Sequence, residues 1–136
     1  MENLKLLPSE FEKIHATLRV LREGFGAQSV TLISRSGQEL AFEGQEDSLD
    51  RQALASLAAS TLAATISLAG LVGEERFHRV YHRGHKMSLV MCPAGDEALL
   101  LVVLNGLSRE HFPSRRLDHA VLVLRDLLER DESVSE

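Results

Sequence analysis

The chain lacks most of the sequence features that identify an enzyme or a secreted protein. It has one cysteine, Cys92, so no disulfide can form within the chain, which is typical of a reducing compartment. The N-terminal segment MENLKLLPSE has no apolar core of a signal peptide. The phosphate-binding loop G-x-x-x-x-G-K-S/T, the G-x-S-x-G elbow and the H-E-x-x-H zinc motif are absent. We therefore expect a cytoplasmic protein with no catalytic site of its own and no cofactor.

The chain also lacks an excess of positive charge. Its formal net charge is -5, whereas nucleic-acid-binding domains usually carry a basic stripe, so we expect no nucleic-acid partner. A length of 136 residues and a hydrophobic content of 44% are typical of one soluble globular domain. We predict a single domain over residues 1–136, with a folded core at about 8–130 and a disordered tail at 131–136.

Charge is missing altogether from residues 52–73, which are mostly alanine, serine, leucine and glycine. The stretch predicts a long helix, and a helix that avoids charge on every side is buried on more than one side. A domain of this length has too little core to bury both faces by itself. We therefore expect a second protein to cover one face.

A membrane-spanning helix is an alternative for this stretch, because a bilayer needs about 20 apolar residues. Its large aliphatic residues are, however, diluted by serine, threonine and glycine, and charges flank it at Asp50–Arg51 and Glu74–Glu75. An interface helix of a soluble protein accounts for the same residues, so we expect no membrane insertion.

Periodicity and turn residues divide the rest of the chain. Ser9 and Glu12 form a capping box that opens a first helix, which ends at a pair of glycines. Asp47 or Ser48 is expected to cap the uncharged helix, and Ser114 a last helix. Five strands are predicted, at residues 29–35, 38–43, 77–82, 86–92 and 97–104.

The predicted order is α-β-β-α-β-β-β-α, which indicates an α+β fold. The nearly continuous aliphatic run at residues 97–104 suits a central strand that is covered on both faces. We predict a five-stranded antiparallel sheet sandwiched by helices.

Projected at about 100° per residue, the uncharged helix divides into two faces. The face expected to pack on the sheet carries most of the large side chains: Leu54, Leu57, Ala58, Thr61, Thr65, Leu68, Ala69 and Val72. The opposite face is small and uncharged: Ser56, Ala59, Ser60, Ala63, Ser67 and Gly70. A solvated face would carry charges, and small residues let another backbone approach closely. The small face is therefore the predicted binding surface, and an alanine-rich helix buried within its own fold is the alternative.

Three segments resemble the Roadblock (dynein light chain Roadblock) domains, in particular those of the bacterial MglB type. They are LASLAASTLAATISLAGLVGEERF at Leu54 to Phe77, YHRGHKMSLVM at 81–91 and ALLLVVLN at 98–105. The first segment ends in the MglB-like pattern L-x-G-E-x-x-F, and the second contains an H-x-G element. Together with the order of elements, the resemblance spans about residues 8–130.

The resemblance implies a Roadblock/longin-like fold and a homodimer in which edge strands pair and the two second helices lie side by side. In the family, this platform binds the GTP form of a Ras-like GTPase. MglB-type members accelerate GTP hydrolysis by an MglA-like GTPase without an arginine finger, in the control of bacterial polarity and motility. The implied GTPase contacts coincide with the small face at Ala59, Ser60, Ala63, Ser67 and Gly70, with Ser56 beside them. The dimer contacts are placed around the expected edge strand, at Phe77, Arg79 and Tyr81.

Two clusters of side chains near that edge strand could form a zinc site or supply an arginine finger. His78, His82 and His85 lie near Cys92 in the sequence, and together these side chains could bind zinc. His85, however, lies beyond a glycine turn. The favoured interpretation is that these are partly exposed histidines of a strand and a turn. Arg76, Arg79 and Arg83 could supply an arginine finger, yet charges at an edge strand commonly protect the edge. We therefore expect no metal site.

Three arginines cluster around the start of the last helix, at Arg109, Arg115 and Arg116. Cations at a helix N-terminus oppose the helix dipole. The cluster indicates either a surface for an acidic partner or a solvated helix end, and the second interpretation is favoured.

The leading hypothesis is a homodimeric GTPase regulator that stimulates hydrolysis. One alternative is a dimeric adaptor that joins other Roadblock or longin-like subunits. Another is a small-ligand sensor, which would need an apolar cavity with convergent polar groups.

Overall fold

The aliphatic run ALLLVVLN forms the middle strand of a five-stranded antiparallel sheet in the computed structural model, which describes residues 7–45, 50–105 and 114–134. The strand order is β2-β1-β5-β4-β3. In chain order the elements are α1 (Pro8–Phe25), β1 (Ser29–Ser34), β2 (Glu39–Gly44), α2 (Arg51–Leu71), β3 (Val80–Arg83), β4 (Met87–Pro93), β5 (Ala98–Asn105) and α3 (Ser114–Val134). The predicted element order and fold class are confirmed.

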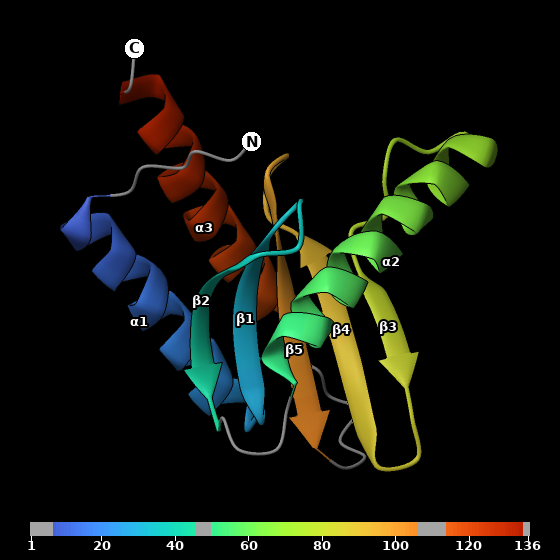
Figure 1. Ribbon diagram of the computed structural model, residues 1–136, viewed down its shortest axis with the longest axis horizontal. Helices are drawn as coiled ribbons and strands as arrows, with labels where there is room; N and C mark the ends of the chain where they lie inside the picture. The colour runs from blue at the N-terminus through green and yellow to red at the C-terminus, as the bar shows by residue number, and fades with distance from the viewer. Residues whose placement is uncertain (1–6, 46–49, 106–113, 135–136) are drawn as a thin grey trace.

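The sheet separates two cores, because side chains alternate along its strands. On one face Leu100 and Val102 pack with α1 and α3, and on the other Leu99 and Leu101 pack with α2. Figure 1 shows α1 and α3 side by side behind the sheet and α2 crossing its front. The prediction that residues 97–104 form a central strand covered on both faces is therefore confirmed.

α1 begins before the predicted capping box. Pro8 is its first residue, a position where the missing N–H of proline is tolerated. The Glu10 carboxylate accepts a hydrogen bond of 3.0 Å from the Leu7 N–H. The assignment of Ser9 and Glu12 as the capping pair is therefore wrong.

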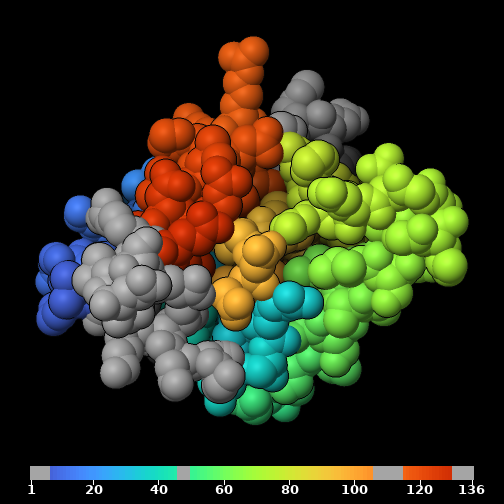
Figure 2. Space-filling model, turned by 90° about the horizontal axis from the view of Figure 1, so that it is seen from above, coloured from blue at the N-terminus to red at the C-terminus, as the bar shows by residue number. Residues whose placement is uncertain are grey.

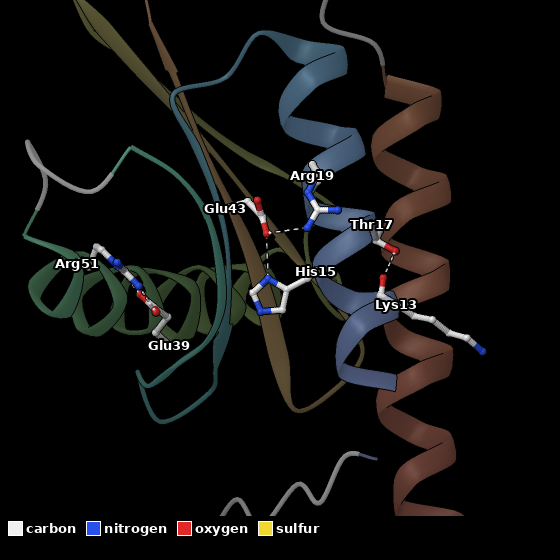
Figure 3. Close-up of polar contacts among 7 residues, drawn as sticks. All are labelled: Lys13, His15, Thr17, Arg19, Glu39, Glu43 and Arg51. Carbon is white, nitrogen blue, oxygen red and sulfur yellow. Dashed lines mark hydrogen bonds and ion pairs between the residues drawn. The ribbon is translucent and has the colours of Figure 1, made fainter. Parts of the chain in front are cut away.

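α2 is fixed firmly at its N-terminus. Asp50 caps it by accepting a hydrogen bond of 3.1 Å from the Ala53 N–H. The predicted caps, at positions 47 and 48, lie outside the described residues. The Arg51 guanidinium donates to the Glu39 carboxylate of β2 at 2.9 Å (Figure 3). It also stacks over the Phe42 ring, 3.8 Å from the ring centroid.

α3 and β3 differ in length from the prediction. α3 continues to Val134, so the predicted disordered tail at 131–136 is helical up to that residue. β3 begins at Val80 rather than 77. The guanidinium of Arg79, the residue before it, binds the Asp118 carboxylate of α3 at 2.7 Å.

Leu100→Ala should lower the free energy of unfolding by about 2–5 kcal/mol, since it opens a cavity in the core between the sheet and the α1–α3 layer. Leu100 is fully buried, whereas Val20 on α1 is exposed. Val20→Ala is the control and should change the free energy of unfolding by less than about 0.5 kcal/mol. Urea denaturation at one fixed protein concentration measures both. An equally small effect of Leu100→Ala would contradict the central position of β5.

Candidate functional site

α2 packs on the sheet through its alanines. Its buried residues are Ala55, Ala58, Ala59, Leu62 and Ala69. All but Ala69 belong to one cluster with large side chains of the central strands, among them Met91 of β4 and Leu101 of β5. Small residues on the helix bring its backbone close to the sheet, and large residues on the sheet fill the space between them.

The predicted division of α2 into faces is wrong by about a quarter turn. Leu57, Leu68 and Val72 were expected to face the sheet, but they are 65%, 55% and 70% exposed. Conversely, Ala59 was expected on the binding surface, but it is buried against the sheet. The helix is apolar on every side, so no contrast between polar and apolar sides marks its buried face. The other predicted binding residues are exposed: Ser56, Ser60, Ala63, Ser67 and Gly70.

Sequence reasoning missed the surface that the helix presents instead. We call it the outer face of α2, and it consists of Ala53, Leu57, Ser60, Ala64, Ser67, Leu68 and Leu71, all exposed. One signal could have located it: residues 55, 58, 59, 62, 66 and 69 form a continuous helical stripe in which four positions are alanine. Such a stripe is typical of close helix-on-sheet packing, and the leucines then fall on the other side.

The outer face is large, uncharged and partly leucine-rich. By length and composition α2 could cross a bilayer, and 22% of its most apolar 18-residue window is buried. A helix of a soluble protein passes the same test, and α2 packs on its own sheet through the buried stripe. Contiguous exposed apolar surface of this kind marks an interaction site.

The C-terminal half of α2 extends past the edge of the sheet beside β3 (Figure 1). Figure 2 shows this end and the segment after it standing out from the body of the molecule. Leu71 there is 83% exposed. In the part of the chain that the structure describes, β3 pairs only with β4, so its other edge offers unpaired backbone groups to another strand.

The three predicted dimer contacts lie in different surroundings. Phe77 and Tyr81 are exposed near the free edge of β3. Arg79 turns towards α3, where it binds Asp118, and its Nη1 lies 3.5 Å from the Tyr81 hydroxyl. Their contact with a second copy stays a prediction.

The arginine cluster is largely engaged within the chain. Arg76 binds the Asp96 carboxylate at 3.0 Å, and Arg79 binds Asp118. Arg83 lies exposed on β3. Two of the three candidate arginine fingers therefore already hold carboxylates.

A polar cavity of about 580 Å³ lies between the start of β3 and α3. His78, Arg79 and Asp118 line it, and Cys92 lies in its wall. Burial raises the pKa of the Cys92 thiol to about 12, so the thiol is neutral and unreactive at neutral pH. Within residues 7–45, 50–105 and 114–134, no three His, Cys, Asp or Glu side chains come together as metal ligands.

Comparisons with known proteins agree with this architecture. Residues 15–105 match the family model of the Roadblock/LC7 domain. The structure of gliding protein MglB from Thermus thermophilus is 29% identical, with a TM-score of 0.87 over 96% of this chain and 98% of that one. Myxococcus xanthus MglB is 33% identical, with a TM-score of 0.82 over 89% and 98%. A structure described as MglB with a tetrameric arrangement is 30% identical, with a TM-score of 0.84 over 96% and 98%. Comparison with curated proteins finds no match.

The buried thiol should make stability fall at high pH. In the unfolded chain Cys92 ionises near its ordinary pKa of 9.0, whereas the folded chain keeps the thiol neutral up to about 12. The unfolded state therefore loses its proton first, and the free energy of unfolding declines as pH rises from about 9 towards 12. Urea denaturation of wild type and Cys92→Ala across this range should show the steeper decline in wild type. Parallel pH profiles would mean that the thiol is not protected by burial.

Proposed function

The chain belongs to the Roadblock/LC7 domain family, and on that premise we propose that it is a homodimeric regulator of a Ras-like small GTPase of the MglA type. The observation that carries the proposal is the exposed, uncharged outer face of α2 beside the free edge of β3. The similarity to MglB structures over nearly the whole chain supports it.

A second copy of the chain is the partner that suits the corner where α2 overhangs β3. Two copies related by a twofold axis would place β3 against β3 and α2 beside α2, so one self-complementary contact would cover both features. Leu68 and Leu71 would then be removed from water, and full burial of a leucine stabilises by about 1.5–3 kcal/mol. The unpaired backbone groups of β3 would gain hydrogen bonds in the same contact.

The GTPase would then contact the small exposed residues of the paired helices. Ser56, Ser60, Ala63, Ser67 and Gly70 project little, so a partner backbone can come close to the helix. The absence of charge from residues 52–73 leaves nothing there to repel phosphate or its bound cation.

We propose that the regulator acts by differential binding and has no catalytic site of its own. A binding partner shifts a GTPase between conformations only as far as it prefers one of them, so preference for the GTP form is required. Because the outer face of α2 carries no arginine, stimulation of hydrolysis would come from repositioning the GTPase's own groups. The proposal places the protein in the cytoplasm, in control of cell polarity or motility.

Leu68→Glu should weaken self-association by at least about tenfold, because a carboxylate would be buried without a partner between the two α2 helices. The fold should persist, since Leu68 is exposed in the single chain. Leu122→Glu on α3 is the matched control, because Leu122 is 48% exposed and lies in the opposite layer. Sedimentation velocity of both variants measures the effect. Equal self-association of the two variants would remove the proposed dimer contact.

Ala63→Arg should abolish binding of the GTPase while leaving the dimer intact, because a long cation would occupy the space that a partner backbone needs. Leu122→Arg places the same group in the α1–α3 layer and should bind normally. Calorimetry with an MglA-type GTPase from the same organism, loaded with a non-hydrolysable GTP analogue or with GDP, measures the affinities.

The outcomes distinguish three parts of this proposal: the site of GTPase binding, the binding itself and the stimulation of hydrolysis. Undiminished binding by Ala63→Arg would move the contact elsewhere on the dimer, whereas absence of binding by wild type would overturn the regulator itself. GTP turnover with and without the protein tests activation. Binding without faster turnover would favour the alternative of a non-catalytic adaptor, including one that joins other Roadblock subunits.

A further inference from the structure

The α1–α3 layer carries a second exposed surface, separated from α2 by the whole sheet. A groove of about 490 Å³ lies between α1 and α3. Its sides are mainly apolar, with Val20 of α1 facing Ala120 and Val123 of α3, and Val20 is 64% exposed. Grooves of this size hold small ligands or a few side chains of a partner.

The groove has an excess of positive charge at one end. Arg115, Arg116 and His119 line it, and among the residues that the structure describes no acidic side chain does. None of the three has a hydrogen bond or an ion pair with a residue that the structure describes. Six other arginines hold a carboxylate or a backbone carbonyl, namely Arg19, Arg22, Arg35, Arg51, Arg76 and Arg79, whereas Arg83 and Arg125 have no such partner among the described residues.

The basic end is built into the packing of the two helices. The Arg116 Nη1 lies where a side chain at Gly24 would begin, so the absence of a side chain on α1 makes room for this guanidinium. Arg115 and Arg116 also lie in the first turn of α3, where the helix dipole adds about half a positive charge. The two arginines and the helix N-terminus repel one another, and an anionic group placed there would relieve this repulsion.

We propose that this groove binds an acidic amphipathic helix of a partner protein. Its apolar side chains, spaced three or four residues apart, enter between Val20 and Val123, and its carboxylates pair with Arg115, Arg116 and His119. The distance from Arg115 to Val123 along α3 is about 12 Å at 1.5 Å per residue, so about two turns of the partner fit. This is helix-in-groove recognition with a charged end.

A protein helix suits the groove better than an anionic membrane. The positive charge is confined to one end of a concave surface, whereas a membrane would meet the exposed ridges of both helices. Those helices also expose carboxylates that an anionic bilayer would repel, namely Glu12 and Glu23 on α1 and Asp126 on α3.

The test uses fluorescence anisotropy with two labelled 14-residue helical peptides. Both have leucine at positions i, i+3 and i+7 on an alanine background, one with glutamate and the other with lysine on the remaining face. The glutamate peptide should bind wild type, and the lysine peptide should not. Arg116→Glu should weaken binding about tenfold or more, and rising salt should weaken it further. Val20→Ser should weaken it several-fold.

Arg125→Glu is the matched control, because it reverses one charge at another exposed position of α3, outside this groove, and should leave binding unchanged. Binding should also survive Leu68→Glu and Ala63→Arg, which separates this surface from the proposed GTPase contact.

The proposal is overturned by equal binding of both peptides, by equal effects of Arg116→Glu and Arg125→Glu, or by a failure of the glutamate peptide to bind. Binding of phosphatidylserine vesicles alone would assign the groove to membranes instead. Loss of self-association in Val20→Ser would assign it to a second copy.

Discussion

The close packing of α2 alanines on the large side chains of the sheet determines what the rest of this molecule can do. Ala55, Ala58 and Ala59 bring the helix backbone near β1, β2 and β4, and side chains of the sheet, among them those of β5, complete the core. The helix therefore uses its small residues inside and keeps several of its leucines outside, as at Leu57 and Leu68. An apolar surface on α2 is a direct consequence of this packing, because its large aliphatic residues cannot all share the close-packed side.

The two ends of α2 are held very differently, and this places the apolar surface at one corner of the molecule. The N-terminal end is fixed to β2 by the Arg51–Glu39 ion pair (Figure 3). The stacking of Arg51 on Phe42 and the Asp50 cap add to it. The C-terminal end extends past the edge of the sheet beside β3 (Figure 1). A helix anchored at one end presents the other in a defined direction, so little conformational freedom is lost when a partner covers it.

The sequence predicted the order of elements and the central strand, because these depend on local periodicity and on a long aliphatic run. It did not predict the buried face of α2. Helical projection ranks faces by the contrast between polar and apolar sides, and residues 52–73 have almost none. Side-chain size alone then predicts that Leu57 and Leu68 face the sheet. In the structure the alanines face it instead, because they allow close packing. The ends of elements depend on tertiary contacts that local periodicity does not show, and the Arg79–Asp118 pair, directly before β3, is a contact of this kind.

Two surfaces of opposite character therefore lie on opposite faces of one sheet. The outer face of α2 is free of charge along its whole length, while the groove between α1 and α3 combines an apolar interior with the positive charge of Arg115 and Arg116. The intervening sheet is closely packed on both sides by separate cores. An occupant of one surface therefore touches no residue of the other, and coupling between them would have to pass through β5. Because β5 is buried on both faces and paired along both edges, it offers little freedom to move, which favours independent occupation of the two surfaces.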